Sequence, residues 1–240
     1  MVGMPPTPRD TTAPSSATRP ELVLEDLEAV ADLERYATRA RTMADTGMRL
    51  QVAGTVLAAW VSVLQPRGLG DGVPVALGLR TFRLGRAGLD GWDAVYALSS
   101  VLERLARMAS TGTPALALPP VTEQAAWTAV TPPRAGWRPV ATVADDELQQ
   151  VAQEGIRELG EALPQDPGAS MVAQARAAVW GRLLGGAGPD DGVLPAGAAL
   201  AAHGLGFLRP GGSTAVHAAG PWVRLSGPSG FVLCRRPMAL

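Results

Sequence analysis

The sequence predicts an α+β fold in which a mainly antiparallel sheet is covered by about five helices. Three observations support this prediction. The chain has 240 residues, and its apolar fraction of 47% is enough to build a core. Helical and strand-like patterns follow one another irregularly, which disfavours a doubly wound parallel sheet. The end of the chain, residues 213–235, reads as a three-strand β-meander.

Composition divides the chain into four segments. Residues 1–20 are rich in Pro, Thr and Ser and are expected to form a disordered tail, because they cannot bury enough apolar surface to offset ordering entropy. Residues 21–118 form an N-terminal α+β half, and residues 119–140 form a connector rich in Pro and Trp. Residues 141–240 form a helical half that ends in the meander. The sequence leaves open whether the two halves make one domain or two.

The first half is predicted to begin with an amphipathic helix over residues 22–43, where apolar residues recur at helical spacing. Its acidic first half and Arg-rich second half complement the helix macrodipole. Residues 50–64 and 73–84 are predicted to be paired strands. Since 50–64 is apolar on both faces, we expect a central strand there, with a helix as the alternative. Helical spacing returns over 93–109, and a short strand is expected at 115–118.

The connector contains two tryptophans, Trp127 and Trp137, among several prolines. Its length without clear periodicity marks a domain boundary or a functional loop. Because Trp rarely stays exposed in a monomer, we expect this segment to cross over and staple the two halves together. Docking of a partner on these tryptophans is the alternative.

The second half is predicted to be helical first. Residues 145–163 place apolar side chains on one stripe, and Asp145 or Asp146 can cap the start. The Asp–Pro pair at 166–167 is predicted to open a second helix, since Asp is a good N-cap and Pro suits the first helical position. Pro195–Leu208 is nearly free of polar groups and is predicted to be a third, buried helix.

Three strands follow, at 213–218, 221–226 and 230–235, with turns at Ala219–Gly220 and Gly227–Gly230. One face of this meander is apolar and is interpreted as the core face. The predicted pairing on that face places Val216 opposite Val223, and Val223 opposite Cys234.

The opposite face of the meander is the most specific surface feature of the sequence. Exposed aromatic and Arg side chains are typical interface anchors, and an Arg over an indole ring adds a cation–π contact. The alternative is that a helix packs on this face, with the Arg stems covering apolar surface. The candidate binding patch consists of His217, Trp222, Arg224, Phe231 and Arg235.

The amino-acid usage excludes several kinds of chemistry. The chain contains no Lys, so it has neither a P-loop lysine nor a Schiff-base lysine. With two histidines, His203 and His217, and one cysteine, Cys234, it cannot build the usual His/Cys zinc site or an intrachain disulfide. No metal and no cofactor are therefore expected.

Charge and hydropathy limit the cellular locations and partners that we expect for the protein. The net charge of −1 gives no overall field to attract nucleic acid or an acidic membrane. Residues 1–20 lack the apolar core of a signal peptide, and no run approaches the ~18 apolar residues of a membrane-spanning helix. A single Cys agrees with a reducing compartment. The sequence thus predicts a soluble, cytoplasmic protein that is neither secreted nor membrane-embedded.

Other potential catalytic groups are interpreted as structural. Carboxylates cluster at Asp90 and Asp93, at 145–147 and at 190–191, either in predicted loops or at a helix start where acids are stabilising. Ser229 lies in a predicted hairpin turn and not in a nucleophile elbow.

These features predict a non-enzymatic protein that acts through protein–protein contacts, as an adaptor or a homo-oligomer. The first alternative is an enzyme or small-ligand-binding protein whose site is built from Arg, carboxylates and Trp. The second is a winged-helix-like nucleic-acid binder, since three helices precede a β-hairpin. The helix that would read DNA, Pro195–Leu208, offers only His203 as a base-reading donor, so nucleic acid is the less expected partner.

Overall fold

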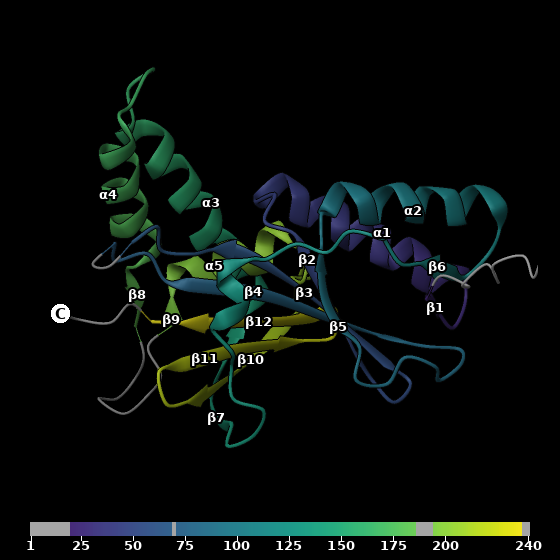
Figure 1. Cartoon of the computed structure of the whole chain (residues 1–240). Coiled ribbons are helices and arrows are strands. Elements are labelled where there is room, and N and C mark those ends of the chain that lie inside the picture. The colour runs from purple at the N-terminus through teal and green to yellow at the C-terminus, as the bar shows by residue number, and fades with distance from the viewer. Residues whose placement is uncertain (1–19, 69–70, 186–193, 237–240) are drawn as a thin grey trace, which may run out of the picture.

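The computed structural model describes residues 20–68, 71–185 and 194–236 (Figure 1). Eight strands of this part form one antiparallel sheet to which both halves of the chain contribute. The halves meet where the fourth and fifth strands of the sheet pair. Across the sheet, the strands are β5 (Asp93–Tyr96), β2 (Met48–Ala53), β3 (Val56–Leu64), β4 (Val75–Arg83), β12 (Gly230–Arg235), β11 (Trp222–Gly227), β10 (Ser213–Ala219) and β7 (Arg138–Ala144).

Five α-helices of the described residues gather on one side of this sheet, as Figure 1 shows. The predicted α+β class, with a large antiparallel sheet and a C-terminal meander, is confirmed. The helices are α1 (Leu27–Met43), α2 (Leu98–Thr111), α3 (Asp145–Ala162), α4 (Ala169–Trp180) and α5 (Ala196–Gly204). The smaller elements are the 3₁₀ helix η1 (Ala126–Ala129), the pair β1 (Glu21–Val23) and β6 (Ala115–Ala117), and the pair β8 (Leu183–Leu184) and β9 (Leu194–Pro195).

The two halves of the sheet are built alike. In each, a helix (α1 or α5) leads into a three-strand meander. An outer strand (β5 or β7) pairs with the first strand of that meander and leads into a second helix (α2 or α3). Because the last strands of the two meanders, β4 and β12, pair antiparallel, an approximate twofold axis normal to the sheet relates the halves.

Side chains alternate along each strand, so the sheet has two distinct faces. One face packs under the helices and forms the main core, in which Tyr36 of α1 and Leu205 after α5 approach β4. The opposite face carries a separate, smaller cluster of buried residues, namely Leu77, Trp127, Trp222 and Leu233. We refer to these as the helical face and the outer face.

The first predicted helix begins later than the pattern indicated. Glu21–Val23 form β1, and α1 starts at Leu27. Asp26 caps this helix by accepting a hydrogen bond from the backbone N–H of Ala29 at 2.8 Å.

Two other segments of the first half each contain a strand that the hydrophobic pattern did not predict. Residues 50–64 are a hairpin and not one strand, because Gly54 adopts a φ of +58° in a tight turn between β2 and β3. The predicted pairing of this segment with 73–84 is confirmed for β3 and β4. Residues 93–109 begin with strand β5 before helix α2 starts at Leu98.

The helices of the second half are confirmed, with different starts. The N-cap of α3 is Ala144, and Asp145 is already the first helical residue. Helix α4 begins at Ala169 and not directly after the Asp–Pro pair at 166–167. Helix α5 ends at Gly204 and not at Leu208, and it is buried as predicted, since every residue from Ala196 to Ala202 is buried. This burial rules out the winged-helix arrangement, because a recognition helix must reach the DNA groove.

The three strands of the C-terminal meander are confirmed, but the predicted register of the first pair is wrong. Val216 pairs with Leu225 and not with Val223, because Gly220–Pro221 form the turn. The shift is by two residues, so every side chain stays on its predicted face. The predicted pairing of Val223 with Cys234 is confirmed.

Gly78 marks a position at the centre of the sheet where a side chain cannot fit. A Cβ there would overlap Leu205 Cδ1 and lie 3.0 Å from the Tyr36 hydroxyl and 3.1 Å from Val61 Cγ2. We therefore expect Gly78→Ala to lower the free energy of unfolding by about 1–3 kcal/mol through overpacking. Urea denaturation followed by circular dichroism measures this change. Gly88→Ala, with no atom within 4 Å of its Cβ, is the matched control, and equal effects of the two changes would contradict the close packing.

Two expectations fall partly or wholly outside the described residues. Of the predicted disordered tail, 1–20, only Pro20 is among the described residues. The carboxylates of 190–191 lie outside them. Among the residues that are described, no helix has both the length and the apolar character that crossing a bilayer requires.

Candidate functional site

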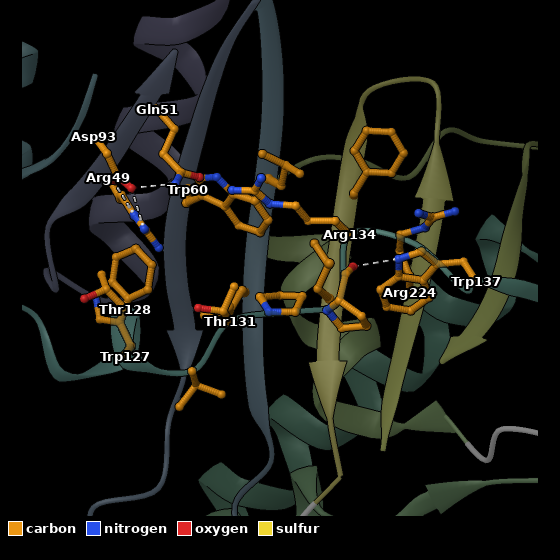
Figure 2. A pocket seen from close by; sticks show the side chains of 17 residues that line it. Arg49, Gln51, Trp60, Asp93, Trp127, Thr128, Thr131, Arg134, Trp137 and Arg224 are labelled. Atoms are coloured by element: carbon orange, nitrogen blue, oxygen red, sulfur yellow. Dashed lines mark hydrogen bonds and ion pairs between the residues drawn. The ribbon is translucent and has the colours of Figure 1, made fainter. Parts of the chain in front are cut away.

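The outer face is covered by the connector, and between them lies a cavity of about 500 Å³ (Figure 2). Its floor is formed by side chains from six neighbouring strands, β5, β2, β3, β4, β12 and β11, and its roof by the connector. The lining residues include Arg49, Gln51, Trp60, Leu77, Leu79, Asp93, Trp127, Thr131, Arg134, Trp137, Arg224, Phe231 and Leu233.

Trp127 fixes the roof to the sheet. The side chain is 4% exposed and packs with Leu77 of the first half and with Trp222 and Leu233 of the second. Its indole N–H donates to the carbonyl of Thr46 at 2.9 Å. Trp127 thus shares one buried cluster with residues of both halves, as expected if the connector staples them together. The cover on this face is the connector, including the short 3₁₀ helix η1 that carries Trp127.

One end of the cavity is polar, and the charges of Arg49 and Asp93 there balance each other. Arg49 of β2 donates two hydrogen bonds to Asp93 of β5, at 2.7 and 2.6 Å, and Gln51 donates a third at 2.7 Å. These bonds, that from Arg49 above all, hold the pKa of Asp93 below its usual value. Asp93 is therefore ionised and committed to its neighbours, which leaves it poorly suited to act as a base.

At the other end, Arg224 lies close to two aromatic rings. Its guanidinium carbon lies 4.7 Å from the ring centre of Trp137 and 5.8 Å from that of Phe231, within cation–π range. Its Nε donates to Ser226 Oγ at 3.0 Å. Burial lowers the pKa of Arg224, but guanidinium stays charged at any ordinary pH. The geometry thus fixes a cation at the edge of an apolar cavity.

His217 supports this arrangement from the neighbouring strand. Its Nδ1 lies 3.3 Å from Ser226 Oγ. Burial, together with the nearby charge of Arg224, lowers the pKa of His217, so the ring is neutral at pH 7 and can accept the hydroxyl proton of Ser226. The Ser226 oxygen then remains free to accept from Arg224, which orients the guanidinium.

The roof adds another cation. Arg134 lines the cavity, and Figure 2 shows its side chain extending across the site toward the strand that carries Trp60. Its charge contributes to the lowered pKa of Asp93, although no carboxylate of the described residues lies within 4.0 Å of it. Trp137 completes the roof and donates its indole N–H to the carbonyl of Pro133 at 2.9 Å.

The residues of the predicted binding patch have different surroundings. Arg224 and Phe231 line the cavity, and His217 is joined to Arg224 through Ser226. Trp222 is buried in the outer-face cluster. Arg235 pairs with Trp222 on one side and Val75 on the other, away from the cavity.

The N-terminal half of the cavity was not anticipated. Arg49, Gln51 and Asp93 lie on strands that the sequence pattern did not resolve, and Trp60 lies in a segment for which the sequence indicated only two apolar faces. The available signal was the alternation along β4, where Leu77 and Leu79 share a face opposite Ala76 and Gly78. That alternation indicated a second apolar face but not what covers it.

The other potential catalytic groups have structural roles. Asp90 accepts from the backbone N–H of Gly54 at 2.7 Å, and buried Asp145 accepts from Arg209 N and Thr214 Oγ1. Cys234 is fully buried, and this burial raises the pKa of its thiol, which makes it a poor nucleophile.

Two family models match the chain. Residues 17–129 match a domain of unknown function, DUF8010, and residues 132–239 match another, DUF8185. The boundary between them falls within the connector. No curated protein matches the chain.

Several solved structures are similar in fold. A protein assigned as a DNA polymerase III beta subunit, from Eubacterium rectale ATCC 33656, is 7% identical, with a TM-score of 0.51 over 92% of this chain and 66% of its own. The corresponding subunit from Borrelia burgdorferi is 5% identical over 90% of this chain and 64% of its own, with a TM-score of 0.48. The DnaN sliding clamp of Pseudomonas aeruginosa is 13% identical over 98% and 68%, also at 0.48. The chain thus spans just under two thirds of the length of the first two, and the likeness concerns the fold alone.

Proposed function

We propose that this chain is a non-enzymatic protein-interaction module whose outer-face cavity docks a segment of a partner protein. The observation that supports this proposal most directly is the cavity itself. Its volume of about 500 Å³ falls within the range of about 300–1,000 Å³ that is typical of ligand pockets. Its walls are rich in Trp, Phe, Leu and Arg, and Trp and Arg are among the residues that most often contribute binding energy at interfaces.

The chemistry of the lining supports binding over catalysis. Asp93 is the one carboxylate among the lining residues, and Arg49 and Gln51 occupy its oxygens. The hydroxyls of the lining belong to Thr128 and Thr131, and no lining His, Cys or Lys stands near them as a base. Docking needs only shape, apolar surface and a few oriented polar groups, all of which the cavity provides.

The fold likeness is compatible with protein contacts, and the charge distribution disfavours nucleic acid. Helix α3, on the helical face, exposes an excess of acid that would repel phosphates. Self-association at the outer edge of β7 is a weaker alternative, because Arg138 and Pro139 at its start blunt that edge. The exposed acidic residues of α3 are Asp146, Glu147, Glu154, Glu158 and Glu161, and its one basic residue is Arg157.

Site-specific photo-crosslinking tests the proposal. A benzoylphenylalanine at exposed Ala135, beside the rim of the cavity, is expected to capture a protein from a lysate of the source organism. Thr131→Trp in the same chain places an indole at the rim and is expected to abolish the capture, because it fills the space that the partner uses.

A benzoylphenylalanine at Ser110, on the helical side, is the positional control and is expected to miss that protein. Equal capture with and without Thr131→Trp, in chains with unchanged circular dichroism, would contradict docking in the cavity.

A small ligand is the second candidate, because the cavity contains the Arg, carboxylate and Trp side chains that such a site requires. Native mass spectrometry of the freshly purified chain distinguishes the two candidates. A small molecule retained by the wild type and absent from Thr131→Trp favours the second.

A further inference from the structure

We propose that the segment docked in the cavity carries a carboxylate beside a bulky apolar side chain, and that Arg224 binds this carboxylate. This inference rests on the proposed function and adds the chemistry of the partner. Its starting point is the charge balance of the cavity. Three guanidinium groups line it, from Arg49, Arg134 and Arg224, against the single carboxylate of Asp93.

Asp93 does not neutralise the other two cations. Its oxygens accept two bonds from Arg49 and one from Gln51, so the Arg49–Asp93 pair is complete. Neither Arg134 nor Arg224 has a carboxylate within 4.0 Å among the described residues. The cavity therefore keeps two positive charges that complement an anionic ligand.

Arg224 is prepared to bind a carboxylate in a defined orientation. Trp137 and Phe231 lie within cation–π range of its guanidinium, and its Nε donates to Ser226 Oγ. The two terminal amino groups remain for a ligand, and a fork of this kind matches the two oxygens of a carboxylate. Since these ring contacts and the Ser226 bond already restrict the side chain, little conformational entropy is lost on binding.

The space next to this cation is apolar. Leu79 and Phe231 are direct cross-strand neighbours, and Leu77 and Leu233 form the adjacent pair on the same face. Trp60 continues this surface on β3, opposite Leu79. A ligand that reaches Arg224 therefore brings apolar surface against these side chains, which a bulky aliphatic or aromatic residue satisfies.

A peptide fits these features better than a nucleic acid does. Single-stranded nucleic acids need a positively charged groove that follows several phosphates, in addition to stacking platforms. Here two cations without a carboxylate partner flank one largely apolar cavity. One carboxylate on an apolar segment matches that number and arrangement of charges.

Selection from a random peptide library on the immobilised full chain tests the inference. We expect the selected peptides to contain Asp or Glu within two residues of an aromatic or large aliphatic residue. For a synthetic peptide from this selection, Arg224→Gln is expected to weaken binding by about tenfold to a hundredfold, measured by isothermal calorimetry. Replacing the acid of the peptide by its amide is expected to cause a similar loss, and the two changes together no further loss.

Three further variants separate the possible outcomes. Arg224→Lys keeps the charge without the planar fork and is expected to bind with intermediate affinity, which guards against a folding defect in Arg224→Gln. Arg107→Gln, an exposed arginine on α2, is expected to bind like the wild type. Thr131→Trp is expected to block binding.

One outcome would overturn this inference and leave docking in place. In it, the selected peptides lack an acid, Thr131→Trp blocks their binding, and Arg224→Gln does not change their affinity. Peptides that Thr131→Trp does not block would overturn the docking function itself. A fluorescent oligothymidylate that bound with the same dependence on Arg224 would overturn the peptide assignment in favour of nucleic acid.

Discussion

Trp127→Ala is expected to lower the free energy of unfolding by about 3–5 kcal/mol, the typical cost of removing a buried Trp side chain. The indole is 4% exposed, contacts both halves of the chain through Leu77 and Leu233, and donates a hydrogen bond to Thr46. Its loss leaves a cavity and releases the connector from the sheet. Urea denaturation followed by far-ultraviolet circular dichroism measures the change, with the slope checked for two-state behaviour.

Two variants of the connector control for this effect. Trp127→Phe keeps most of the buried area and loses the hydrogen bond, so a smaller cost is expected. Val121→Ala removes apolar atoms from a side chain that is 71% exposed in the same segment, so its effect should be within about 0.5 kcal/mol. A cost below about 1 kcal/mol for Trp127→Ala would show that the connector is not held by this residue.

Asp145→Ala is the second change with a large expected effect, about 3 kcal/mol or more. The carboxylate is 2% exposed and accepts from Arg209 N at 2.8 Å and from Thr214 Oγ1 at 2.6 Å. Alanine leaves the buried Thr214 hydroxyl and the partly buried Arg209 N–H without that acceptor, and an unsatisfied buried group costs about 1–3 kcal/mol. It also removes a negative charge from the first turn of α3, where the helix dipole favours one.

The adjacent residue provides the comparison. Asp146 is exposed and accepts one bond, from the backbone N–H of Gly211 at 3.2 Å, so Asp146→Ala is expected to cost no more than about 1 kcal/mol. Both variants are measured in the same urea titration. Equal costs for the two would mean that burial of the Asp145 carboxylate does not determine its contribution.

Local patterns predicted the elements that are long or regularly spaced. Helix α3 and the C-terminal meander are examples, because many residues repeat one period. The pattern failed where one residue decides the backbone path. Gly54 turns β2 into β3 within a continuous apolar run, and the four residues of β5 are too few to show alternation before α2.

The candidate site could be predicted only in part. Arg224 and Phe231 were found because they share a face of a hairpin, which depends on neighbours in sequence. Arg49, Asp93 and Trp60 join them across the pairing of β4 with β12, and no short-range signal specifies which distant strands pair. Trp137 was recognised as a residue that needs burial, but its contact with Arg224 was not anticipated.

The pairing of β4 with β12 also has a consequence for how the chain folds. Each meander can form from contacts between neighbouring strands, whereas this central pairing joins Leu77 to Leu233, about 150 residues away. Closing so large a loop costs chain entropy and therefore slows this pairing. We expect the two half-sheets to form early and to dock late. Until they dock, β4 of one half and β12 of the other each present an unpaired strand edge. Either edge can pair with its partner strand in the same chain or in another copy of the chain. The centre of the sheet is therefore where nascent chains are most exposed to domain swapping.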